Sequence, residues 1–303
     1  MRKSADDAIP MAPGSALELS HRQEIDARLA PLRESLGKDC LSEFAFPNLY
    51  LFRQAHDYRF LPGRWPCVAG LTYDGARHLM PLFDLAEAPL QVLRDLLQGY
   101  DCFYPVPAAT ARRLDPALFQ VTQFDADADY LYAAENFRSY RGEVLRKKRQ
   151  LMQQLLRQHQ VTHAPLDASR IDDARMLLSG WMRDKDKGAG EADESSCHEA
   201  LQLAGHFGFD ASIYYADGAP AGFIIAEHLN AGTAAMRFAK GSDRYKGIYQ
   251  HMFHDFAMRA KELAWINFEQ DLGLPNFRQT KRSYQPAELL QKCRVALRYP
   301  SAT

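Results

Sequence analysis

The residues whose types and spacing could do chemistry gather near the end of the chain, in residues 265–286 (WINFEQDLGLPNFRQTKRSYQP). The apolar stretch 265–268 predicts a short buried strand. A dense set of charged, amide and phenol side chains then follows before Pro286: Glu269, Gln270, Asp271, Asn276, Arg278, Gln279, Lys281, Arg282 and Tyr284. Mixed α/β folds commonly place their chemistry where a strand ends and a loop begins. We therefore expect a functional site here. Local pairing within a solvated loop would explain any single residue equally well, but it explains the whole set less well.

Glu227 is a second candidate, near the end of the apolar stretch GFIIAEHL. Strand alternation places it on the same face as Phe223 and Ile225. An unpaired carboxylate on an apolar face has a raised pKa, which suits a general base for an ammonium substrate. Pairing with Arg237 or Lys240 on the adjoining strand is the equally weighted structural alternative.

Composition limits the classes of protein to consider. The chain has 303 residues, is 47% hydrophobic and carries a formal net charge of −1, which suits one large globular domain or two ordinary ones. Its five cysteines are far apart and form no CxxC pair, which argues against a disulfide framework and against a structural zinc site: Cys40, Cys67, Cys102, Cys197 and Cys293. We expect no metal site. The start of the chain lacks a signal-peptide pattern and no apolar run is long enough to cross a bilayer, so we expect a cytoplasmic protein with a flexible tail over residues 1–15.

The predicted elements form two successive units, 16–128 and 129–303. The first contains a helix at 21–36 interrupted by Pro31, a helix at 89–97, an acidic connector at 125–129, and strands at 44–52, 67–73, 78–83, 103–106 and 118–124. The pattern then restarts with helices at 140–160 and 171–185 and a polar loop at 185–196. The second unit continues with strands at 211–216, 222–229 and 233–240, a helix at 245–263, the strand at 265–268 and an extended pair at 288–299.

This second element order resembles that of the GNAT acyltransferase fold. The sequence RYKGIYQ, residues 244–250, approximates the phosphate-binding loop of that superfamily, in which a glycine and a helix N-terminus bind a pyrophosphate. Arg244, Lys246 and Gly247 would contribute to such a loop. Tyr249 replaces the second small residue of the pattern, and its bulk could obstruct coenzyme A.

A family resemblance covers most of the chain. It is carried by FAFPNLYLFR (44–53), DYLYAAENFRSYRGEVLRKKRQ (129–150), GAPAGFIIAEHL (218–229), RFAKGSDRYKGIYQ (237–250) and INFEQDLGLPNFRQTKRSYQP (266–286). These segments resemble bacterial proteins related to the C-terminal domain of phosphatidylglycerol lysyltransferase, a tandem GNAT arrangement similar to the Fem-type aminoacyl transferases. The resemblance implies an α/β (α+β) fold of two GNAT-like units with mixed sheets flanked by helices. It also implies transfer of an acyl or aminoacyl group to an amine or hydroxyl, with aminoacyl-tRNA as donor in the best-understood relatives.

Four consecutive basic residues bear on the donor: Arg146, Lys147, Lys148 and Arg149. They create a local field that attracts anions in a chain that is otherwise nearly neutral. Three interpretations remain open: a solvated helix face, a docking strip for tRNA and a patch for acidic lipid headgroups. We give the solvated face about half the weight, because charge runs in a single sequence are weak predictors.

The resulting hypothesis is a transferase site between the strand at 222–229, the loop at Arg244 and the segment 269–284. Glu227 or Glu269 would deprotonate the acceptor, and Tyr284 or Lys281 would stabilise the leaving group, with Asp271 in the same site. Donor phosphate would be bound by Arg237, Lys240, Arg244, Lys246, Gly247, Tyr249 and Arg278. No tightly bound cofactor is expected, and the co-substrate is aminoacyl-tRNA or acyl-coenzyme A. The acceptor is a small molecule, a peptide or a lipid headgroup. The alternatives are an acyl-coenzyme A-dependent N-acetyltransferase and a non-catalytic protein that binds tRNA or a nucleotide.

Overall fold

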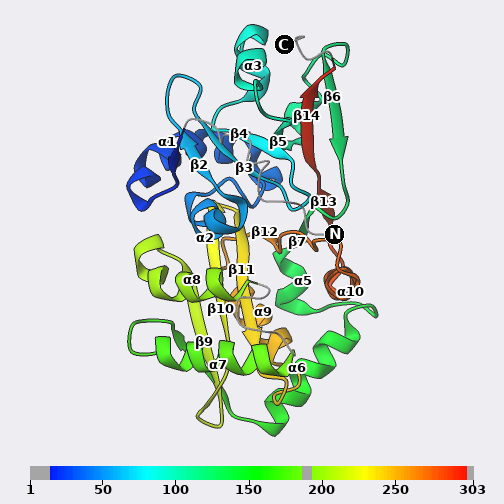
Figure 1. The fold of residues 1–303 in the computed structure, drawn as a ribbon. Helices are drawn as coiled ribbons and strands as arrows, with labels where there is room; N and C mark the ends of the chain where they lie inside the picture. Colours follow the sequence, from blue (N-terminus) through cyan, green and yellow to red (C-terminus); the bar gives the residue numbers. More distant parts are fainter. Residues whose placement is uncertain (1–13, 186–192, 299–303) are drawn as a thin grey trace, which may run out of the picture.

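Two seven-stranded mixed sheets form the framework of the protein (Figure 1). This computed structural model describes residues 14–185 and 193–298. In spatial order, the first sheet contains β1 (Ser15–Ala16), β2 (Arg59–Leu61), β3 (Cys67–Leu71), β4 (Arg77–Pro81), β5 (Cys102–Pro107), β14 (Lys292–Leu297) and β6 (Phe119–Gln123). The second contains β8 (Val161–Pro165), β9 (Asp210–Ala216), β10 (Ala219–Asn230), β11 (Thr233–Gly241), β12 (Trp265–Asn267), β7 (Asp129–Ala133) and β13 (Glu288–Leu290).

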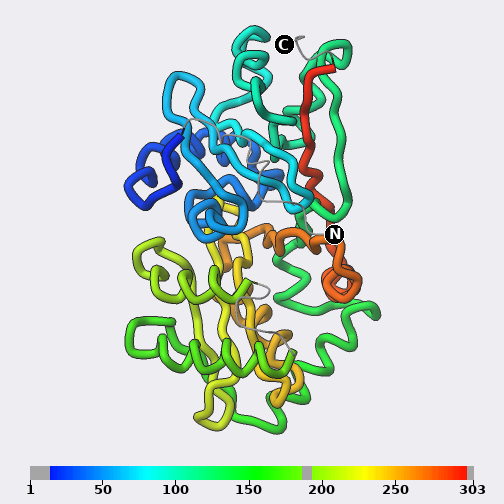
Figure 2. Tube along the Cα trace, viewed as in Figure 1, coloured from blue at the N-terminus to red at the C-terminus, as the bar shows by residue number. Residues whose placement is uncertain are grey.

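Both sheets follow the same plan, and the first one contains a strand from the end of the chain. Five strands lie side by side in chain order, β1 to β5 in one sheet and β8 to β12 in the other. The sixth position is taken by β14 in the first sheet and by β7 in the second. Figure 2 shows the C-terminal segment, coloured red, running through the upper half of the molecule beside cyan and green strands. The chain therefore crosses between the sheets twice, from β6 to β7 and from β13 back to β14. We expected residues 129–303 to form one unit, but residues 292–297 complete the first sheet.

Each sheet has one parallel pair of strands, β4 with β5 and β11 with β12, and the other pairs are antiparallel. The first half contains η1 (Leu19–His21), α1 (Arg22–Leu36), η2 (Gly37–Asp39), α2 (Phe46–His56), η3 (Leu85–Glu87), α3 (Leu90–Leu96) and α4 (Ala108–Ala111). The second half contains α5 (Ala134–Ser139), α6 (Arg146–Gln158), α7 (Ile171–Asp184), α8 (Glu194–Phe207), α9 (Ile248–Arg259) and α10 (Pro275–Arg282). In the second half, α7 packs on β10 and β11 and also contacts α8, while α9 contacts the same two strands together with α5 and α6.

The prediction of a strand at 44–52 is wrong, because these residues form most of α2. Pro47 lies in the first turn, where a missing N–H costs nothing. The helix is apolar on nearly all sides, with Phe46, Leu49 and Leu51 buried, and a short continuous apolar run cannot be assigned to strand or helix by its period. In Figure 1, α2 lies between the two sheets.

Several other boundaries differ from expectation. The long helix predicted at 140–160 starts only at Arg146, because Tyr140 adopts a left-handed conformation that ends α5. Pro31 lies inside one continuous helix, α1. Residues 1–13 of the predicted tail lie outside the described residues, whereas Ser15 pairs with Phe60 in the first sheet. Residues 186–192 of the predicted polar loop also lie outside them.

One of the buried hydrophobic clusters contains residues of both halves. Phe46 and Leu49 of α2 belong to the same buried cluster as Phe223, Ile225 and Phe238 of the second sheet. Burial of this kind is the main favourable term in folding, so the two units stabilise each other as well as themselves.

Removing β14 tests this dependence. A chain that ends after Gln291 loses β14, which lies between β5 and β6 and hydrogen-bonds to both. We expect this chain to aggregate or to lose its cooperative thermal transition, because two long sheet edges become unpaired. Circular dichroism melts and size-exclusion chromatography provide the measurement. A chain that ends after Arg298 is the matched control and should melt like the full-length protein. Equal melting temperatures for both truncations would show that β14 does not contribute to stability.

Candidate functional site at the junction of the two sheets

A fully buried ion pair lies where the chain crosses between the sheets. Asp129 is the first residue of β7 and Lys292 is the first residue of β14, so each stands at one of the two crossing points. Lys292 Nζ lies 2.6 Å from Asp129 Oδ1, and neither side chain is exposed. Burial opposes both charges, but Asp129 and Glu43 keep the pKa of Lys292 above its ordinary value, and Lys292 keeps that of Asp129 below its own. Both groups are therefore charged near neutral pH.

Ser42, just before α2, connects this pair to its surroundings. Its backbone N–H donates to Asp129 Oδ2 at 2.8 Å, and its hydroxyl lies 3.1 Å from Asp129 Oδ1. Asn267, at the end of β12, donates to Asp129 Oδ2 at 2.9 Å. Lys292 also contacts Glu43 Oε1 at 2.5 Å and donates to Gln270 Oε1 at 2.7 Å. The buried charges are thus hydrogen-bonded by residues from both units, as burial requires.

A second buried cation lies beside the first group. Arg237 on β11 is flanked by Glu227 on β10, at 2.7 Å, and by Glu269 after β12, at 2.5 Å. Its guanidinium also donates to the Ser42 carbonyl at 2.8 Å, so Ser42 contacts both clusters. Burial raises the pKa of Glu227 and Arg237 works in the opposite direction. The structure therefore brings Glu227, Arg237 and Glu269 together, as the sequence hypothesis required, and it also supplies the structural partner that we set against catalysis.

The backbone of Glu269 is held in an uncommon conformation. Its φ is +57°, in the left-handed region that non-glycine residues rarely adopt. Asn267 Oδ1 accepts its N–H at 2.7 Å, and Lys281 Nζ donates to the carbonyls of Phe268, at 2.6 Å, of Glu269, at 3.1 Å, and of Gln270. Burial lowers the pKa of Lys281 to about 8. Lys281, which we expected to stabilise a leaving group, instead fixes the turn that carries Glu269.

A small polar pocket opens beside these clusters. It has a volume of about 30 Å³ and is lined by Glu43, His56, Tyr58, Thr72, Tyr73, His78, Tyr104, Asp127, Gln270 and Arg294. This volume suits one water molecule or one ammonium group. Among the described residues, none hydrogen-bonds to the hydroxyls of Tyr58, Tyr73 or Tyr104, and His78 Nδ1 is buried without a partner. Tyr73 is 61% exposed, so the pocket reaches the surface there. We call it the junction pocket.

Glu43 is the titratable group of this pocket best suited to proton transfer. Burial raises the pKa of its carboxyl, although Lys292 acts in the opposite direction. A carboxyl whose pKa moves toward neutrality can accept a proton at physiological pH. The histidines are poorer candidates, because burial lowers the pKa of His56 and lowers that of His78 to about 3.

Two further predicted site residues pair locally. Arg278 Nε donates to Asp271 Oδ2 at 2.8 Å, and Tyr130 donates to the same oxygen at 2.7 Å. Asp271 is fully buried, and these contacts lower its pKa although burial opposes its charge. This arrangement matches the structural alternative for Asp271 and Arg278.

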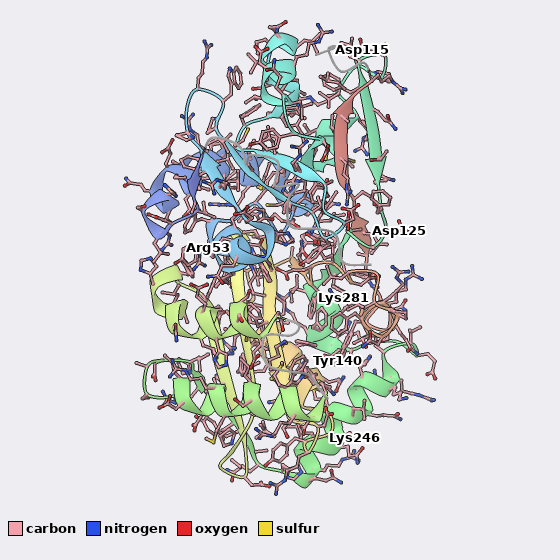
Figure 3. All side chains as sticks on the ribbon, viewed as in Figure 1. Arg53, Asp115, Asp125, Tyr140, Lys246 and Lys281 are labelled. Carbon is pink, nitrogen blue, oxygen red and sulfur yellow. The ribbon has the colours of Figure 1, made fainter. Side chains whose placement is uncertain are left out.

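The predicted phosphate loop lies away from the junction. Figure 3 shows Lys246 near the lower end of the molecule and Lys281 near its middle. Gly247 has a φ of +102°, and a Cβ on it would approach the Leu151 carbonyl oxygen to 2.2 Å. Packing of α6 against this turn therefore requires glycine. Arg244 is exposed and its guanidinium lies 5.4 Å from the Tyr245 ring.

The donor-binding candidates Tyr249 and Lys240 and the leaving-group candidate Tyr284 have partners within the chain. The Tyr249 hydroxyl accepts the Gly241 N–H at 3.0 Å, at the end of β11. Lys240 contacts Asp193 at 2.6 Å and lies 3.9 Å from the centre of the Trp181 ring. The Tyr284 hydroxyl accepts a hydrogen bond from Gln250 at 2.7 Å, and Lys148 lies over its ring at 3.9 Å.

Of the four predicted nucleic-acid-binding residues, two are available at the surface. Arg146 and Lys147 are exposed, and Arg146 pairs with the exposed Glu143. Burial, with a smaller effect of Lys147, lowers the pKa of Lys148 to about 8, while Arg149 donates to the Tyr140 carbonyl.

Sequence reasoning missed Glu43, Asp129 and Lys292. Asp129 was assigned to an acidic connector. Glu43 is the one charged residue of the short stretch SEFAF, and Lys292 shares the stretch LLQKCRVAL with Arg294. A charge within an apolar stretch was the available signal, because such residues are almost never buried unless they are paired.

Comparisons with known proteins agree with this architecture. The sequence profile of the family described as "Phosphatidylglycerol lysyltransferase, C-terminal" matches residues 37–295. The chain belongs to this family. A comparison with curated proteins finds no match.

Solved structures similar to this family member share its fold. A conserved protein of unknown function from Bacteroides thetaiotaomicron VPI-5482 has a TM-score of 0.78 at 23% identity, covering 95% of this chain and all of its own. L-PGS from Bacillus licheniformis has a TM-score of 0.60 at 14% identity, covering 97% and 95%. FemX has a TM-score of 0.61 at 9% identity, covering 91% and 96%. The predicted tandem GNAT-like fold is confirmed, and the family is one of aminoacyl transferases.

Within the described residues of this phosphatidylglycerol lysyltransferase-like chain, no helix is long and apolar enough to cross a membrane. His, Cys, Asp and Glu side chains in the same residues form no group of three or more that could hold a metal ion.

Replacing Lys292 with Met tests the buried pair at the crossing. We expect a loss of about 3–5 kcal/mol of unfolding free energy, because Asp129 is left buried without its cation. Adding Asp129→Asn to Lys292→Met should recover part of that loss, since the stranded charge is removed. Lys246→Met changes an exposed lysine and should alter stability by less than about 0.5 kcal/mol. Urea unfolding followed by circular dichroism gives these values. A Lys292→Met protein as stable as the parent would show that the pair does not hold the crossing together.

Proposed function

We propose that this protein transfers an aminoacyl group from aminoacyl-tRNA to an amine or hydroxyl acceptor, and that the reaction takes place at the junction pocket. The observation that carries the proposal is an excess of carboxyl groups at the junction. Within the described part of the chain, the buried Glu43, Asp129 and Glu227 and the half-buried Glu269 form ion pairs with two cations, Lys292 and Arg237. A site of this kind attracts a substrate that carries positive charge, and an aminoacyl group carries an ammonium.

The walls of the pocket suit the same substrate. The aromatic rings of Tyr58, Tyr73 and Tyr104 line it beside Glu43. Aromatic faces and carboxylates both attract an ammonium group, and the attraction is stronger where water is excluded. A simple acyl group, which is uncharged, would gain nothing from this arrangement.

The chemical step requires one proton to move. The acceptor amine or hydroxyl attacks the ester carbonyl that links the amino acid to the tRNA ribose, and it gives its proton to the Glu43 carboxylate. The new amide or ester bond forms, the carbon–oxygen bond to the ribose breaks, and the departing ribose oxygen takes the proton back from Glu43. Lys292 orients Glu43 through its contact with Oε1, and Arg237, held by Glu227 and Glu269, completes the buried electrostatic environment.

The end of β11 favours aminoacyl-tRNA over acyl-coenzyme A as the donor. The Gly241 N–H is already bonded to the Tyr249 hydroxyl, and burial raises the pKa of that phenol to about 12, so it stays a neutral hydrogen-bonding group. A pantetheine arm or pyrophosphate placed there would have to displace Tyr249. The exposed charges of Arg146 and Lys147 on α6 offer a macromolecular polyanion a separate contact.

Glu43→Gln tests the catalytic role. Turnover should fall by about two orders of magnitude or more, because general-base catalysis contributes roughly 10²–10⁴-fold. Activity of the parent should decline as the pH falls below the raised pKa of Glu43, since only the carboxylate accepts a proton. The assay follows labelled amino acid leaving lysyl-tRNA or alanyl-tRNA in the presence of phosphatidylglycerol vesicles or ethanolamine. Lysyl-tRNA should be the better substrate because of its second ammonium.

Glu262→Gln, at an exposed position, is the matched control and should keep full activity. Unchanged turnover by Glu43→Gln, with Glu269→Gln inactive instead, would move the base to Glu269. Tight binding of tRNA without turnover by the parent would favour the non-catalytic alternative.

The donor contact predicts a salt effect. Arg146→Ala/Lys147→Ala should weaken tRNA binding and reduce the slope of log affinity against log salt by roughly two, because two phosphate contacts are lost. Arg28→Ala/Lys261→Ala removes the same charge from exposed positions on other elements and should leave the slope unchanged. Filter-binding titrations at several salt concentrations measure it. Equal slopes for the two double variants would show that α6 is an ordinary solvated helix that does not contact tRNA.

A further inference from the structure

Each sheet contains one place where two parallel strands diverge. In the second sheet, β11 pairs with β12 only over residues 233–235, although β11 continues to Gly241. In the first sheet, β4 pairs with β5 only at His78 and Leu79, opposite Cys102 and Phe103, and the two strands end at Pro81 and Pro107. The divergence lies at the carboxyl ends of the strands, where open α/β sheets bind their ligands.

The chain's own side chains span the divergence in the second sheet. The Tyr249 hydroxyl bonds to Gly241 at the end of β11, and the Tyr249 ring lies 6.3 Å from that of Phe253. Phe253 lies 4.9 Å from Phe268, which directly follows β12. Aromatic contacts therefore join the end of one strand to the end of the other.

The equivalent place in the first sheet is hollow. A cleft of about 220 Å³ lies there, between Pro81 and Phe83 after β4 and the end of β5. It is lined by Leu32, Ser35, Leu36, Phe44, Pro81, Phe83, Asp84, Leu85, Pro105, Val106, Pro107, Ala109, Thr110 and Arg113. Most of these side chains are apolar. Among the lining residues only Asp84 and Arg113 are charged, and they pair with each other at 2.5 Å.

We propose that this cleft binds an aliphatic acyl chain that carries an anionic head, a carboxylate or a phosphate. The apolar walls exclude water from the chain, which is the main source of its affinity. Arg113 has a side chain that is 52% exposed, so it can turn from Asp84 to an anion on the ligand. The planar guanidinium has a fork of donors whose geometry matches both a carboxylate and a phosphate.

The cleft is separate from the junction pocket. Glu43 lines the junction pocket and Phe44 lines the cleft, and likewise Tyr104 lines the pocket and Pro105 the cleft. Backbone therefore stands between the two hollows. The inference is independent of the proposed function, because binding can be measured without aminoacyl-tRNA.

Isothermal titration calorimetry of the full-length protein tests the proposal with three probes: decanoate, decyl phosphate and decanol, each below its micellar concentration. Decanoate and decyl phosphate should bind, and decanol should bind roughly tenfold more weakly because it lacks a charge-assisted bond to Arg113. Comparison of the first two probes identifies which anionic head the cleft prefers.

Three variants locate the binding. Ala109→Trp fills the cleft from an exposed position on α4 and should abolish binding of all three probes, whereas Ala117→Trp, exposed and outside the cleft, should bind as the parent does. Arg113→Gln should remove the preference for the anions. Asp84→Asn should strengthen anion binding, because it frees Arg113 while its amide oxygen can still accept the Ala86 N–H, now held at 3.0 Å.

The proposal fails if the parent binds none of the probes, or if Ala109→Trp binds them as well as the parent does. Equal affinity of the parent for decanoate and decanol would show that the cleft does not recognise an anionic head group. Thermal melts of each variant confirm that lost binding does not reflect unfolding.

Discussion

The buried contact between Lys292 and Asp129 is the constraint on which the rest of the structure depends. Each residue is the first of a strand that the chain carries into the opposite sheet, so one ion pair closes both crossings. A buried pair contributes little net stability relative to an apolar pair, because desolvation offsets the attraction. Its effect is specificity: a shift of either strand by one residue would leave a charge buried alone. We infer that this penalty fixes the register of β7 and β14.

The same constraint explains why the polar groups of the junction are held rigidly. Ser42 contacts Asp129 through its N–H and Arg237 through its carbonyl, so neither cluster can move independently of the other. Glu269 stays in a left-handed conformation because Asn267 and Lys281 hold it there. Strain that persists at a polar site has to be held by its surroundings. Here the surroundings are Lys281 and Asn267, and Asn267 also donates to Asp129.

The sequence alone predicted the tandem fold and several contacts, but not the centre of the site. Pairing of Glu227 with Arg237 or Lys240 was the structural alternative to catalysis, and the structure shows the pair with Arg237, because side chains on one face of adjoining strands meet. The density of polar groups after Trp265 predicted a functional site in the segment that carries Glu269, and this segment lies at the junction. Two features could not be predicted. The pairing of β14 depends on partners almost two hundred residues away, and the period of a strand reveals its face but not its sheet. The apolar run in α2 fits helix and strand equally well, so Glu43, just before it, could not be placed.

Side chains fill the gap between the diverging strands of the second sheet, whereas the gap in the first sheet is open. This difference limits the kind of donor that fits. A narrow gap between parallel strands suits a thin, flexible arm that adds its own hydrogen bonds to a strand edge. In the second sheet Tyr249 already uses the last amide of β11, so such an arm would have to break that bond. A donor whose reactive end is attached to a large polyanion cannot enter such a narrow gap. It requires a site that opens at the surface. The junction pocket has this property, since Tyr73 is 61% exposed at its edge while Glu43 is buried inside it. Under the proposed function, the second unit can therefore close its strand gap without loss of the reaction, and the first unit, whose gap remains open, is free to bind a molecule of different chemistry.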